Sequence, residues 1–173
     1  MKKIALAGAT IALAMAASSA YAANSLNAGT IGLHIPVITS TSTTNTNINS
    51  PIISGSYFIA RDMAVLGGFG FSSGGPSGNS TTTFALMGGV RKYMKVDDFA
   101  PFAGAFVKYE STSSSPTATA MTIAAEGGAE YFLAKQFSVE GKVIFGYQSV
   151  ESAGTKSTYF GSTTANLGLN FYF

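Results

Sequence analysis

The sequence predicts an all-β fold, an eight-stranded antiparallel up-and-down barrel that follows a short leader. Three observations predict it. Apolar and polar side chains alternate with a period of two, as in strands, where successive side chains leave opposite faces. Charged residues make up only 10% of the 173, well below the roughly one quarter usual in soluble domains. After the leader, no stretch approaches the ~20 consecutive apolar residues of a membrane-spanning helix.

The first 22 residues predict a secretory signal peptide. Lys2 and Lys3 precede an apolar stretch that is too short to span a membrane, and Ala20 and Ala22 form a small-x-small cleavage site. The predicted division is therefore a signal peptide at 1–22 and one barrel domain at 23–173, exported by the general secretory route.

Charge and cysteine content exclude several classes of function. Without Lys2 and Lys3, eight basic residues balance eight acidic ones, so no positive excess favours nucleic-acid binding. The absence of cysteine excludes disulfides, thiolate metal sites and cysteine nucleophiles. A single histidine, His34, excludes sites that need two imidazoles. The glycine pairs match no nucleotide-binding fingerprint, and we expect no cofactor.

The strands follow in order from this alternation. The first strand ends near Pro36 and the second begins near Pro51, positions at which the missing N–H of proline is tolerated. The third alternates from Val65 to Phe71, and the fourth places Arg91 and Lys92 on opposite faces. The fifth to seventh set acidic and basic residues against apolar ones, and the last alternates most clearly, ending at Phe173. The eight predicted strands are 27–37, 51–60, 64–73, 82–94, 100–111, 120–133, 138–150 and 158–173.

The connections between these strands alternate in kind. Long connections rich in Ser, Thr, Asn and Gly are predicted at 38–50, 73–81, 112–118 and 151–157. Short ones with charged and aromatic flanks are predicted at 60–63, 95–98 and 134–137. An even number of strands returns the chain to its starting side, so both termini should lie at one end of the barrel.

The apolar face is predicted to point outward, toward lipid. The polar face carries Gly, Ser, Asn and a few charges, unlike the dense Lys and Glu cover of a soluble surface. Lipid contact is predicted for Val65, Phe69, Leu86, Ile123, Val143, Phe145, Leu167 and Leu169. Aromatic girdles are predicted from Tyr57, Phe58, Tyr93, Phe99, Phe102, Tyr131, Phe132 and Phe173 near the short turns, and from Phe69, Phe71, Phe84, Tyr109, Tyr147 and Tyr159 near the long loops.

The leader, the alternating strands, the short Tyr-Phe-x-Ala turns, Pro101-Phe-Ala-Gly104 and the terminal Phe173 resemble the small outer-membrane β-barrel proteins. This eight-stranded group includes the OmpA-type transmembrane domain and the OmpX-type proteins. The resemblance implies the outer membrane of a Gram-negative bacterium, with contacts to its lipid and lipopolysaccharide. It also implies a recognition signal for the barrel assembly machinery in Leu167, Leu169, Phe171, Tyr172 and Phe173. No periplasmic domain follows the strands, so a peptidoglycan-anchoring role is not implied.

Seven ionisable residues fall on the predicted lumenal face: Arg91, Lys108, Glu110, Glu126, Glu130, Glu140 and Lys142. They could form a structural salt-bridge plug or gate an ion pathway. The plug is favoured, because an eight-stranded barrel is just wide enough for its side chains to fill it. The pattern also allows Glu130 and Glu140 to face each other, which is unfavourable unless Arg91, Lys108 or Lys142 lies between them.

His34 invites comparison with outer-membrane acyl hydrolases, whose chemistry needs a serine, a histidine and an orienting acid. The strand pattern places no serine beside His34, so we expect no catalytic, cofactor or metal site and no enzyme.

The sequence predicts a monomeric protein with a structural or surface-interaction role. Any surface ligand is expected to bind through the loops 38–50, 73–81, 112–118 and 151–157. A narrow channel for small or hydrophobic solutes is the alternative, and a lipid-modifying enzyme is a distant third.

Overall fold

The computed structural model describes residues 26–38, 52–74, 81–113, 117–162 and 166–173. No helix in these ranges is long and apolar enough to cross a membrane. The described residues form nine strands: β1 (Ile31–Ile38), β2 (Ile53–Ala60), β3 (Met63–Gly74), β4 (Thr81–Tyr93), β5 (Phe99–Ser113), β6 (Ala118–Ala134), β7 (Phe137–Ser152), β8 (Thr155–Ser162) and β9 (Asn166–Tyr172).

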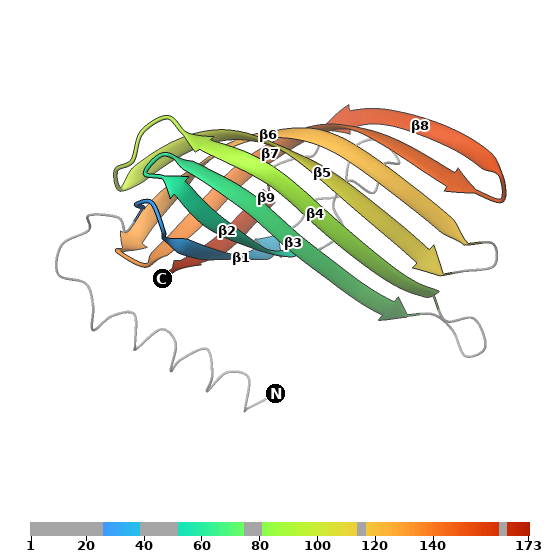
Figure 1. Cartoon of the computed structure of the whole chain (residues 1–173), viewed down its shortest axis with the longest axis horizontal. Helices are drawn as coiled ribbons and strands as arrows, with labels where there is room; N and C mark the ends of the chain where they lie inside the picture. The colour runs from blue at the N-terminus through green and yellow to red at the C-terminus, as the bar shows by residue number, and fades with distance from the viewer. Residues whose placement is uncertain (1–25, 39–51, 75–80, 114–116, 163–165) are drawn as a thin grey trace.

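The strands close into an antiparallel barrel (Figure 1). Each of β1 to β7 pairs with its neighbours in sequence, and β9 pairs with both β7 and β1, which closes the ring. β8 and β9 follow one another along β7, from Ser152↔Thr155 to Phe137↔Phe171. They therefore share the position of the one strand predicted at 158–173, and the predicted eight-stranded barrel is confirmed.

The short turns and the C-terminus lie at one end of the barrel, and the β7–β8 hairpin lies at the other (Figure 1). Leu26, the first described residue, is 1% exposed and belongs to the same interior cluster as Phe58 and Tyr172. The first strand begins at Ile31, so the predicted start at 27 is wrong. Gly29 adopts φ 93° and its N–H bonds to the Phe58 carbonyl, a turn geometry that cannot continue a strand.

The predicted long connection at 151–157 is also wrong. β7 runs to Ser152 and β8 starts at Thr155, so Ala153 and Gly154 alone make the turn. Both have positive φ, 51° and 75°, which matches the twist of a two-residue hairpin. The composition of this segment suggests a loop. The pairing of β7 with β8 nevertheless extends both strands into it, as far as Ser152 and Thr155.

Burial alternates along the strands as predicted. Seven of the eight side chains predicted to contact lipid are exposed, from 38% for Val65 to 58% for Phe69, and the eighth, Leu169, is partly buried. The girdle near the long loops also faces outward, but half of the girdle predicted near the short turns does not. Phe58, Tyr93, Phe102 and Phe132 are at most 3% exposed and form an interior aromatic cluster. Adjacent residues such as Tyr57 and Phe58 leave opposite faces of one strand, so only one of each pair can point outward.

Candidate functional site in the barrel interior

All seven residues predicted to be lumenal point into the barrel. Four strands supply them: β4, β5, β6 and β7. Six are buried, and the Lys142 side chain is 23% exposed. Their ion pairs fall into two groups, one around Arg91 and one between Lys108 and Glu110. Phe106, Ala124 and Ile144 form an apolar cluster in the same interior.

Arg91 is the centre of the larger group, the Arg91 network, which also contains Glu126, Glu130, Glu140 and Lys142. Its guanidinium contacts Glu126 at 2.8 Å, Glu130 at 3.1 Å and Glu140 at 2.5 Å. The Cζ atom of Arg91 lies 3.8 Å from the centre of the Phe102 ring, so the guanidinium also makes a cation–π contact with this ring. Burial of one guanidinium against three carboxylates uses the planar, multidentate donor geometry that lysine lacks.

Gly104 makes the pairing of Arg91 with Glu126 sterically feasible. In the sheet register, Arg91 on β4 lies opposite Gly104 on β5, which lies opposite Glu126 on β6. A Cβ at Gly104 would come within 3.0 Å of the Glu126 carboxylate. The missing side chain lets the two charged groups meet across an intervening strand.

Glu130 joins the Arg91 network to the aromatic cluster. Its carboxylate accepts hydrogen bonds from the hydroxyls of Tyr93 at 2.6 Å, Tyr172 at 2.5 Å and Ser138 at 2.8 Å. It lies directly opposite Glu140 in the β6–β7 register, as the strand pattern allowed. The Arg91 guanidinium bridges both carboxylates and so offsets their repulsion.

Lys108 and Glu110 form the second group, with an ion pair of 2.9 Å. Gln148 donates to Thr122 at 3.2 Å beside them. Along β5 the inward side chains therefore run from Phe102 in the aromatic cluster, past Phe106, to Lys108 and Glu110, farther from the short-turn end.

His34 has a serine partner, contrary to the sequence-based expectation. Its Nε2 lies 2.9 Å from Ser56 Oγ on β2, and its Nδ1 lies 2.8 Å from Asn170 Oδ1 on β9. A serine, a histidine and an asparagine in hydrogen-bonded order resemble a nucleophilic triad in outline. Ser56 is only 4% exposed and is not among the residues that line the interior cavity. The arrangement ties together the three strands at which the barrel closes.

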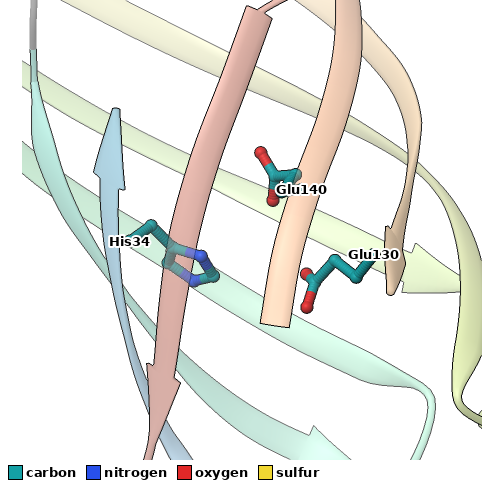
Figure 2. Close-up of side chains that lie close together, drawn as sticks. All are labelled: His34, Glu130 and Glu140. Carbon is teal, nitrogen blue, oxygen red and sulfur yellow. The ribbon is translucent and has the colours of Figure 1, made fainter. Parts of the chain in front are cut away.

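His34, Glu130 and Glu140 also place potential metal-ligand atoms within 4.8 Å of one another. Figure 2 shows the three side chains directed toward a common region. Their donor atoms are already engaged, however, by Ser56, Asn170, Arg91 and the tyrosine hydroxyls. The Arg91 guanidinium supplies the positive charge that a metal ion would bring to the two carboxylates. These residues therefore act as a hydrogen-bonded network.

A cavity of about 90 Å³ lies beside the Arg91 network. We call it the seam cavity, because its lining includes residues of β1 and β9, where the barrel closes. Met87, Phe106 and Ile144 supply apolar wall, and Glu126, Glu140 and Lys142 supply charge.

Sequence reasoning missed the polar partners that complete these networks. Tyr93, Tyr172 and Asn170 share the inward phase of their strands with Arg91 or with one another, so the period-two pattern could have found them. Of the residues implied as an assembly signal, Tyr172 is fully buried and Phe173 is 73% exposed, while Leu167, Leu169 and Phe171 lie on the opposite phase to Tyr172. The cleavage residues Ala20 and Ala22 lie outside the described residues, as do most of the predicted loops 38–50 and 73–81 and residues 114–116 of the predicted loop 112–118.

The short-turn end carries two exposed ion pairs. Lys92, on the outward phase of β4, pairs with Asp62 in the β2–β3 turn, and this hydrogen bond lowers the pKa of the Asp62 carboxyl. Lys95 pairs with Asp97 at 2.7 Å and lowers the pKa of that carboxyl in the same way.

Several solved structures are similar to this chain, two of which are described here. The N-terminal β-barrel domain of Pseudomonas aeruginosa OprF is 13% identical, with a TM-score of 0.49 over 84% of this chain and 98% of that chain. Ail, the attachment invasion locus protein of Yersinia pestis, is 14% identical, with a TM-score of 0.37 over 83% of this chain and 95% of that chain. No protein-family model and no curated protein matches the sequence.

Proposed function

We propose that this protein is an integral outer-membrane β-barrel of a Gram-negative bacterium, with a structural or surface-interaction role. The observation that carries the proposal is the inversion of polarity between its two faces. The interior buries Arg91, Lys108 and four glutamates, whereas the exterior exposes Phe69, Phe145 and many other large apolar side chains. Such an exterior is stable in hydrocarbon and unstable in water.

Closure of the barrel supports the same location. A strand in lipid has no water to satisfy its backbone groups, so every edge must be paired. The ladders of β9 with β1 and with β7 provide that pairing at the end with the short turns. The exposed ion pairs Lys92–Asp62 and Lys95–Asp97 at this end suit an aqueous boundary on the periplasmic side.

The interior favours a plugged barrel over a channel. Arg91, Glu130 and Tyr172 are at most 2% exposed and bonded to one another across the lumen. An ion would have to displace these contacts to pass. A narrow channel remains the alternative function. Single-channel recording in planar bilayers distinguishes the two, because a plugged barrel should not conduct ions. Steady conductance by the wild-type protein would favour the channel.

The proposed surface interaction is made by the loops that connect the strands. The segment 38–50 is uncharged and dominated by Ser, Thr and Asn, groups that suit contact with lipopolysaccharide sugars or another surface. Deletion of residues 40–49 should leave folding intact and reduce adhesion or phage adsorption. If every surface phenotype survives that deletion while Glu126→Gln or Lys142→Met changes solute permeability, the channel function replaces this one.

The location is tested by gel mobility and fractionation. A closed barrel resists detergent, so the unheated protein should migrate differently from the boiled protein, and it should fractionate with outer membranes. A protein found soluble in the periplasm with no heat-modifiable band would overturn the proposal.

A further inference from the structure

The seam cavity extends to the barrel wall between β1 and β9. Ile35 on β1 and Leu167 on β9 lie on the outward phase, 37% and 42% exposed, and both line the cavity together with inward residues such as Phe106. Residues of both phases therefore border the cavity where these two strands meet.

The backbone of β1 is irregular at the same place. The β1–β2 ladder ends at His34↔Ser54, although β1 continues to Ile38. The β1–β9 ladder shifts register between Pro36 and Ile38, a bulge at a residue that has no N–H to donate. The pairing of β1 is thus irregular where the cavity meets the wall, between strands that the proposed function places in lipid.

The shape and lining of the seam cavity fit one narrow amphiphile. A single water needs about 10–15 Å³ of such volume, so about 90 Å³ admits several waters or one slender chain. Met87, Phe106 and Ile144 favour an alkyl segment over a file of water. Two ammonium groups line the cavity, those of Lys108 and Lys142. Lys108 is 2% exposed and pairs with Glu110, whereas the more exposed Lys142 contacts Glu126 at 3.1 Å and Glu140 at 2.9 Å and is the better placed of the two to hold a head group. An ammonium has three N–H donors, and this one keeps 23% side-chain exposure beside the cavity.

The charge of the interior selects the head group. The seven lumenal residues comprise four carboxylates and three cations. A further anion beside them is disfavoured, whereas an uncharged oxygen can accept a hydrogen bond from Lys142 without adding charge. An alcohol or carbonyl head group therefore fits better than a carboxylate.

We infer that the seam cavity binds a single alkyl chain with an uncharged, hydrogen-bond-accepting head group, taken up from the bilayer between β1 and β9 at the irregularity beside Pro36. The chain lies against Met87 and Phe106, and its head group bonds to Lys142. The inference rests on the proposed location in a membrane.

A tryptophan reporter tests it, because the protein has no tryptophan of its own. Phe106→Trp places the reporter on the cavity wall, and Val107→Trp places a matched control on the next residue, 43% exposed on the outer face. Each variant is reconstituted in phosphatidylcholine vesicles and titrated with a terminally brominated undecanol, the matching bromoalkane, or the matching carboxylate at neutral pH.

The alcohol should quench Phe106→Trp saturably, at a concentration about tenfold below the alkane or the carboxylate, as expected for one hydrogen bond to a charged group. Val107→Trp should be quenched in proportion to the bromine content of the bilayer for all three probes. Adding Lys142→Met should remove the preference for the alcohol. Adding Ser54→Leu, which fills the cavity and leaves the charges intact, should abolish saturation.

Each contrary result has a separate meaning. Quenching of Phe106→Trp that never saturates, with Val107→Trp quenched normally, overturns the inference and leaves the membrane location standing. An unquenched Val107→Trp overturns the proposed location itself. Tighter binding of the carboxylate than of the alcohol overturns the assignment of an uncharged head group.

Discussion

Replacement of Arg91 by Met should destabilise the barrel by about 3–5 kcal/mol, the cost of removing one partner from a buried ion pair. Arg91 faces Glu126, Glu130 and Glu140 at 2.5–3.1 Å, and all three carboxylates are buried. Without the guanidinium, Lys142 alone opposes three acids, and Glu130 lies directly across from Glu140 with no charge between them.

The next residue on β4 provides the control. Lys92 pairs with Asp62, but this pair is exposed to solvent, with side-chain exposures of 54% and 44%. Exposed pairs contribute about 0–1 kcal/mol, so Lys92→Met should be nearly neutral. Free energies of unfolding are measured by urea titration of protein folded in phospholipid vesicles, followed by the heat-modifiable gel shift and tyrosine fluorescence.

Two further measurements separate electrostatics from packing. Acidification protonates the uncompensated carboxylates of Arg91→Met, so its deficit relative to the wild type should shrink as the pH falls. Combining Arg91→Met with Glu130→Gln and Glu140→Gln leaves Lys142 opposite Glu126 alone, and should recover most of the loss. If Arg91→Met costs no more than Lys92→Met, or if the triple variant is no more stable than the single one, the Arg91 network is not what stabilises the interior.

Four other outcomes are expected. Val143→Arg should cost about 2–4 kcal/mol in lipid vesicles by facing hydrocarbon, whereas Ile144→Arg should fail by overfilling the lumen; normal folding of Val143→Arg alone would mean that the faces are inverted. Gly128→Ala should be strongly destabilising, because its Cβ would lie 2.2 Å from the Gly141 carbonyl oxygen, while Gly127→Ala, with no atom within 4 Å, should be tolerated in the same unfolding assay. Ala153→Gly should raise the unfolding midpoint slightly, because Ala153 holds φ 51° at a cost of about 1–2 kcal/mol for a non-glycine residue; a lowered midpoint would contradict the turn. Deletion of Phe173 should impair assembly in cells more than refolding in detergent, and equal loss in both would indicate packing rather than recognition.

The sequence by itself determined the strand content and the two faces of the barrel. Period-two alternation is a local property of the chain, so Val65, Leu86 and Ile123 could be placed outside, and Arg91, Glu126 and Glu140 inside, without knowledge of the fold. The same pattern already separated Phe58 from Tyr57. Position along a strand places an aromatic residue near one end of the barrel, but its phase decides whether it faces lipid or the interior.

Only the tertiary structure decided which inward residues meet. Arg91 and Glu126 lie on strands separated by β5, and their contact depends on the register that brings Gly104 between them. His34 meets Asn170, 136 positions away, because the barrel closes through β1 and β9. Its contact with Ser56 follows from the pairing of β1 with the neighbouring strand β2. The seam cavity likewise depends on a register shift at Pro36. Alternation gives each side chain a direction, but its neighbours are set by strand register and ring closure, which are properties of the assembled barrel.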